Sequence, residues 1–159
     1  MRCALIHRPA GQWPDREAEE VVTLDFHARY RRRMRLMTDQ GSDLDLNLPK
    51  AVAMADGDGL QLEDGKWLRI RAAAEPIIEV RHDDLGQFAR IAWHLGNRHL
   101  PTEIHGRVIR IKPDPVIEDM VVGLGADIKR VDAPFQPEGG AYGGTGHHHG
   151  HVPGGHDRE

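Results

Sequence analysis

The chain has 159 residues, a length that fits one ordinary domain or two small ones. Its 21 Lys and Arg against 25 Asp and Glu give a formal charge of −4, which argues against a general nucleic-acid binder because such proteins carry a basic surface. No segment approaches the roughly 20 apolar residues of a membrane-spanning helix, so neither nucleic acid nor a membrane is an expected partner. The N-terminus is too polar for a secretory signal and the single cysteine, Cys3, excludes an intramolecular disulfide, so we expect a cytoplasmic protein.

Residues 1–74 have the pattern of a small all-β domain. Short runs bounded by turn residues predict strands over residues 21–26, 31–37, 44–48 and 67–70. Turn signals stand at residues 57–59 and 64–65, and no helix is predicted before residue 80. The run from Arg29 to Arg35 is a basic strand, which is usually a solvated face but could also dock an acidic partner.

Residues 75–138 have a different pattern, in which strands alternate with helices. A short apolar run over residues 77–80 predicts a buried strand. Asp83 or Asp84 can cap a helix that ends at Gly96. Its apolar residues recur at helical spacing, and they are Phe88, Ile91, Ala92 and Leu95.

The rest of this region predicts two strands within residues 103–111, around a turn at His105, and then a second helix. Asp114 followed by Pro115 is a helix cap with proline at the first helical position, and Gly125 ends that helix. The apolar residues that this helix is expected to present to the core are Val116, Met120, Val121 and Leu124. A last strand follows over residues 127–131. The order β-α-β-β-α-β predicts a ferredoxin-like domain, and the whole chain an α+β fold of two domains.

Residues 139–159 are expected to form a flexible tail. They hold 8 of the 18 glycines and few apolar side chains, so they cannot bury enough surface to offset the entropy of ordering. The tail contains five of the 11 histidines: His147, His148, His149, His151 and His156. Imidazoles on such a segment can capture divalent ions. An engineered purification tag is the alternative, but Gly150 interrupts the run, and we favour natural metal binding.

Two further histidines, His94 and His99, lie near the end of the first predicted helix. A separation of five residues corresponds to roughly 140° around a helix, so their rings would not converge on one ion. His99 alone is not a complete site, although a two-fold dimer could bring two copies together. Spacing alone favours a simpler role, in which His99 caps the helix or bonds to the turn. His105 and His94 are possible auxiliary metal ligands, whereas His7, His27 and His82 are expected to be solvated.

The sequence shows no recognisable enzyme motif. It has no glycine-rich phosphate loop, no HExxH and no nucleophile elbow. It also lacks a CxxC pair, which disfavours a soft Cu(I) site and leaves a site built on imidazole. We therefore do not expect an enzyme.

Four segments resemble the UreE-type urease accessory proteins, which are nickel metallochaperones. These segments are WHLGNRHLP at 93–101, DPVIEDM at 114–120, LGA at 124–126 and APFQPEGGAY at 133–142. RRRMR, LDLNLP, GDGLQLEDG and AAAEP in the first half agree more loosely and in the same order.

The resemblance implies an N-terminal β domain that binds a partner or peptide, over residues 1–74. It also implies a ferredoxin-like metal-binding domain that forms a homodimer, over residues 75–138, followed by the tail. His99 of both subunits would then lie at the two-fold axis. The chain departs from some relatives in its RIKPDPV segment, where Lys112, Pro113 and Pro115 replace possible auxiliary imidazoles.

The function that the resemblance implies is delivery of Ni²⁺ to the urease apoprotein complex, with a UreG-type GTPase as partner. Zn²⁺, Cu²⁺ or Co²⁺ can be expected to bind in vitro, since imidazole alone does not select nickel. The alternative functions are a cytoplasmic nickel or zinc buffer that delivers to no partner, and a peptide-binding adaptor. A nickel-dependent complex with the GTPase would separate a carrier from a buffer.

Overall fold

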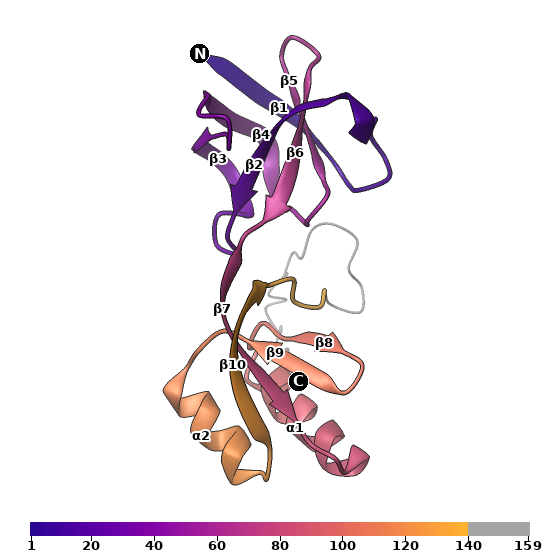
Figure 1. The fold of residues 1–159 in the computed structure, drawn as a ribbon, viewed down its shortest axis with the longest axis vertical. Helices are drawn as coiled ribbons and strands as arrows, with labels where there is room; N and C mark the ends of the chain where they lie inside the picture. The colour runs from indigo at the N-terminus through magenta and orange to yellow at the C-terminus, as the bar shows by residue number, and fades with distance from the viewer. Residues whose placement is uncertain (140–159) are drawn as a thin grey trace, which may run out of the picture.

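The computed structural model describes residues 1–139, which form two lobes stacked along the long axis of the molecule (Figure 1). A six-stranded sheet makes the N-terminal lobe, and a four-stranded sheet with two α-helices makes the C-terminal lobe. Strand β7 (Ala74–Arg81) and the segment after β10 (Asp127–Pro134) run between the lobes. The predicted mostly-β first part and mixed α/β second part are thus confirmed. Among the described residues, no helix is long and apolar enough to span a membrane.

The N-terminal sheet has the strand order β2-β6-β5-β1-β4-β3. Its elements are β1 (Arg2–Arg8), the short 3-10 helix η1 (Asp15–Glu17), β2 (Ala18–Leu24), β3 (Tyr30–Met37), β4 (Asp43–Ala53), β5 (Gly59–Leu62) and β6 (Trp67–Ala72). Alternation in β4 turns Leu44, Leu46 and Leu48 into one core while their neighbours stay exposed, as the sequence predicts.

Strand β5 begins at Gly59, the last residue of the turn that the sequence predicts over residues 57–59, and the sequence did not predict this strand. Only the first part of that prediction holds, because Gly57 has a φ of +83° and β5 starts two residues later at Gly59. The Trp13 ring occupies the space that a Cβ at Gly59 would need. Gly59 is therefore needed for close packing inside a strand. From the neighbouring sequence alone, such a glycine cannot be distinguished from a glycine in a turn.

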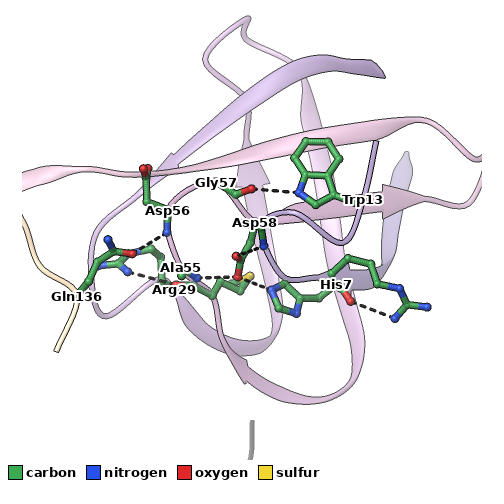
Figure 2. A network of polar contacts seen from close by, with 11 residues as sticks. His7, Trp13, Arg29, Ala55, Asp56, Gly57, Asp58 and Gln136 are labelled. Atoms are coloured by element: carbon green, nitrogen blue, oxygen red, sulfur yellow. Dashed lines mark hydrogen bonds and ion pairs between the residues drawn. The ribbon is translucent and has the colours of Figure 1, made fainter. Parts of the chain in front are cut away.

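The residue His7 is half-buried and its side chain is nearly inaccessible to solvent, so the expectation that it is solvated is wrong. Figure 2 shows its contact with Asp58, in which Nε2 lies 2.7 Å from Oδ2. The His7 side chain is 8% exposed. The Asp58 carboxylate also accepts the backbone N–H groups of Ala10 at 2.9 Å and Ala55 at 2.8 Å. His82 is half-buried, with Nδ1 accepting the N–H of Asp84, whereas His27 is exposed as expected.

The C-terminal sheet has the order β10-β7-β9-β8, and every neighbouring pair is antiparallel. Its remaining elements are α1 (Leu85–Asn97), β8 (Glu103–His105), β9 (Val108–Ile111) and α2 (Pro115–Gly123). Both helices pack on the same face, since one core joins Ile78 and Ile109 of the sheet to Ile91 of α1 and Val121 of α2. The element order is the β-α-β-β-α-β order that the sequence predicts.

Local signals set the helix ends. Asp84 caps α1 by accepting the N–H of Gln87 at 2.8 Å, and α1 continues one residue beyond the predicted end at Gly96. Asp114 caps α2, accepting the N–H of Val116 at 3.0 Å. The expectation that Val116 packs inward is wrong, because it is 69% exposed while Ile117 and Val121 face the core.

Acid is expected to destabilise the C-terminal sheet partly through Glu79 of β7. Burial raises the pKa of this carboxyl, but hydrogen bonds from Arg110 and Arg81 lower it by more, so its pKa lies below the ordinary value of 4.5. A lowered pKa contributes stability above the unfolded value, and that stability is lost as the pH falls through the folded value. Glu79→Gln should cost about 2 kcal/mol at pH 7. The difference from wild type should shrink below pH 4.5 in urea unfolding.

The matched control for this prediction is Glu63→Gln, at an exposed carboxyl of the N-terminal lobe. It should change the free energy of unfolding by less than about 0.5 kcal/mol at either pH. A Glu79→Gln deficit that stays constant down to acid pH would contradict the charged role of Glu79.

Candidate metal centre

His99 lies directly after helix α1, in a backbone conformation that is rare for its residue type. The N–H of His99 donates to Gly96 O at 3.0 Å, and the N–H of Leu100 donates to Leu95 O at 3.3 Å. This pair of bonds is a Schellman motif, whose left-handed position is usually occupied by glycine. In residues 1–139, His99 is the one non-glycine residue with a positive φ, at +54°. A strained residue that persists at such a position is typical of functional sites.

The backbone of His99 ends the helix, while its imidazole remains free of that task. The side chain is exposed, and within the described part of the chain neither ring nitrogen has a hydrogen-bond partner. Spacing favoured a role in which His99 caps the helix or bonds to the turn, and its backbone does so through Gly96, whereas its ring takes no part in those bonds. An exposed imidazole on a fixed backbone can offer a nitrogen to an ion.

A hollow of about 590 Å³ adjoins His99. Its walls come from the end of α1, strand β8, Phe26 of the N-terminal lobe and residues 137–139. In residues 1–139, no group of three or more His, Cys, Asp or Glu side chains is placed to hold a metal ion. In the described part of the chain, His99 therefore lacks the further ligands of a closed site.

The structure does not bring His94 or His105 into a ligand group with His99. His94 lies within α1, half-buried, with its ring 5.0 Å from that of Trp93. His105 ends β8, and its Nε2 lies 2.9 Å from Oε1 of the buried Glu103. A carboxylate commonly orients a ligating imidazole in this way. The tail histidines 147, 148, 149, 151 and 156 lie outside the described residues.

The residues that stand in place of auxiliary imidazoles have structural roles. Lys112 pairs with the carboxylate of Glu75 at the junction of the lobes. Pro115 is the first residue of α2, where a missing N–H costs nothing. Lys112 and Pro115 thus each have a place in the fold.

Residues 135–138 join the two lobes, a role that the sequence analysis missed. Arg29 is only 4% exposed and donates to the carbonyl oxygens of Phe135 and Met54, so it is not part of a solvated basic strand. Gln136 Oε1 accepts the N–H of Asp56 at 2.8 Å (Figure 2). The Phe135 ring is fully buried and packs edge-on against Phe26 at 5.1 Å.

Glu138 completes this segment on the C-terminal side. Its N–H donates to Thr102 O at 2.8 Å, and its Oε1 accepts the N–H of Ile104 at 3.2 Å. Glu138 and His99 line the same hollow. The only sequence signal for the role of Glu138 was the PEGG run within residues 133–142, and that run does not indicate a function by itself.

Comparison with known proteins assigns the chain to a family. Residues 4–73 match the N-terminal domain model, and residues 75–159 the C-terminal domain model, of the UreE urease accessory protein. The chain belongs to the UreE family. The urease accessory protein UreE of Beijerinckia indica is 46% identical over 144 residues, which cover 90% of this chain and 83% of that protein.

Other UreE proteins are similarly close. That of Rhodopseudomonas palustris strain BisB18 is 52% identical over 131 residues, covering 82% of this chain and 62% of that protein. That of a Chelativorans species is 48% identical over 145 residues, covering 88% and 92% of the two chains. The resemblance drawn from the sequence motifs is therefore confirmed.

Proposed function

We propose that this UreE-family protein is a metallochaperone that carries Ni²⁺ and delivers it to the urease apoprotein during assembly of the urease active site. The observation that carries the proposal is His99, held in a left-handed conformation at the end of α1 with its side chain exposed. Family membership supports the accessory role. The protein acts by binding and exchanging the ion, and no catalytic step is part of the proposal.

The metal site is proposed to form between two subunits. An isologous interface places the same residue of each subunit across the axis, so two copies of His99 can bind one ion. A pair of imidazoles leaves coordination positions open, which suits ligand exchange better than a closed cage. The exposed position of His99 supports this arrangement. His105 and His94 are auxiliary candidates, of which His105 is the better supported through Glu103.

The proposal divides the chain into three parts. Residues 1–74 bind a partner, residues 75–138 bind the metal and form the dimer, and residues 139–159 are a tail that collects metal. The strand order β10-β7-β9-β8, with both helices on one face, supports a ferredoxin-like topology for the second domain. Strand β7 begins at Ala74, within one residue of the proposed boundary.

The proposed partners are a UreG-type GTPase and the urease apoprotein complex in the cytoplasm. Ni²⁺ is the proposed cargo, although Zn²⁺, Cu²⁺ and Co²⁺ should compete at an imidazole site in vitro. The test is a pull-down of the GTPase by this protein with and without nickel. A nickel-dependent complex is expected, whereas tight nickel binding without any complex would favour a buffer protein.

Truncation after Tyr142 should separate the proposed tail from the site at His99. It removes five histidines, so we expect fewer nickel ions per dimer with the tightest site retained. The free energy of unfolding should stay within about 0.5 kcal/mol of wild type. Equilibrium dialysis gives the stoichiometry and size-exclusion chromatography the dimer. Loss of all tight nickel binding on truncation would mean that residues 1–142 hold no site.

A further inference from the structure

The backbone that carries His99 is held at both ends. Residues 98–102 connect α1 to β8, and the helix-ending bonds to Leu95 and Gly96 fix their first half. Glu138 holds the other end. The N–H of Glu138 donates to Thr102 O, and the Glu138 carboxylate accepts the N–H of Ile104, two residues further along. The connection is therefore fixed on one side by helix α1 and on the other by Glu138, which lies 39 positions after His99 in the chain.

Strand β8 needs such a partner because it lies at the edge of its sheet. It has three residues and, within residues 1–139, pairs with β9 alone, so its other edge presents backbone groups that no described strand covers. Glu138 accepts the N–H of Ile104 in this strand with its side chain, and it donates its own N–H to the carbonyl oxygen of Thr102, the residue just before the strand. A short edge strand fixed in this way gives the preceding residues a defined end point.

We propose that Glu138 is a positioning residue for His99, and that it keeps the connection between α1 and β8 in the conformation that presents the imidazole to nickel. The inference rests on the proposed function, in which His99 binds the ion. Glu138 is exposed, so its bonds compete with water and add little to global stability. Their effect is expected on the site they border and much less on the fold.

The competing role for Glu138 is direct ligation, since its carboxylate borders the same hollow as His99. The two roles require different properties of the side chain. Positioning requires an acceptor at Oε1 for the N–H of Ile104, which a glutamine amide oxygen also supplies. Ligation of nickel by a carboxylate requires the negative charge, which glutamine lacks.

The experiment uses the full-length protein, titrated with Ni²⁺ by calorimetry, together with amide hydrogen exchange at Ile104. Glu138→Ala should weaken the tightest nickel site by about tenfold, the size typical of residues that orient a ligand, and should speed exchange at Ile104. Glu138→Gln should restore both affinity and protection to near wild type. Gln136→Ala is the matched control, because its side chain bonds to Asp56 of the other lobe and it leaves the Glu138 bonds in place.

Each other outcome overturns the inference. Wild-type nickel affinity in Glu138→Ala, despite faster exchange at Ile104, would show that this bond does not position the site. Equal losses in Glu138→Ala and Glu138→Gln would assign the carboxylate a charged role and would exclude mere positioning. Tight nickel binding by His99→Ala would instead defeat the proposed function itself, which distinguishes that failure from failure of the inference alone.

Discussion

Replacing His99 with alanine is expected to abolish the tightest nickel site, while His94→Ala leaves it nearly intact. One substitution removes a ligand from each subunit if the two copies share an ion across the two-fold axis. His94 lies in α1 with its ring against Trp93, and the helix has ended before His99. The measurement is nickel stoichiometry and affinity by calorimetry, alongside activation of urease in a reconstituted system. Activation should fail for His99→Ala even where the tail still collects nickel.

A second substitution, His99→Gly, separates ligand loss from damage to the fold. The left-handed conformation costs a residue other than glycine about 1 kcal/mol, so His99→Gly should keep or raise the free energy of unfolding. It should lose the tightest nickel site as completely as His99→Ala. Equal losses of nickel in the His94 and His99 variants, or normal urease activation by His99→Ala, would rule out the proposed site.

Arg29→Ala is expected to cause the largest loss of stability, about 3 kcal/mol, because it leaves two buried carbonyl oxygens without their charged hydrogen-bond donor. Burial lowers the pKa of the Arg29 guanidinium, and the charges of Glu75 and Asp56 oppose that effect. The substitution deprives the carbonyl oxygens of Phe135 and Met54 of their donor. Urea unfolding followed by tryptophan fluorescence measures the loss.

The matched control is Arg31→Ala, which removes an exposed arginine from the same run of sequence. It should change the free energy of unfolding by less than about 0.5 kcal/mol. Similar losses in both variants would mean that the contacts of Arg29 across the junction contribute no more than ordinary surface interactions.

The parts of the fold that the sequence predicted are those set by neighbouring residues. Asp114 and Pro115 determine where α2 begins through bonds within four residues, and strict alternation determines which face of β4 is buried. Strand β5 and the burial of His7 depend on distant contacts, with Trp13 against Gly59 and with Asp58. No local pattern contains such information.

The same distinction applies to the candidate site. The family resemblance of the WHLGNRHLP segment implied a ligand role for His99, but the left-handed backbone of His99 was not predicted, because glycine is the residue expected there. Arg29 was read as part of a basic strand, since its partner Phe135 is 106 positions away. Glu138 was missed for a related reason, because its partners are backbone groups that leave no trace in side-chain composition.

The joining segment 135–138 divides its bonds between the lobes, and this division predicts how the protein responds to being split. Its Phe135 and Gln136 contacts go to the N-terminal lobe, whereas both Glu138 bonds stay within the C-terminal lobe. A fragment that starts at Ala74 would keep the bonds next to His99 but would uncover the fully buried Phe135 ring. Such a fragment should bind nickel but should also aggregate beyond the proposed dimer through the exposed Phe135 ring. Phe135→Ser should reduce this aggregation.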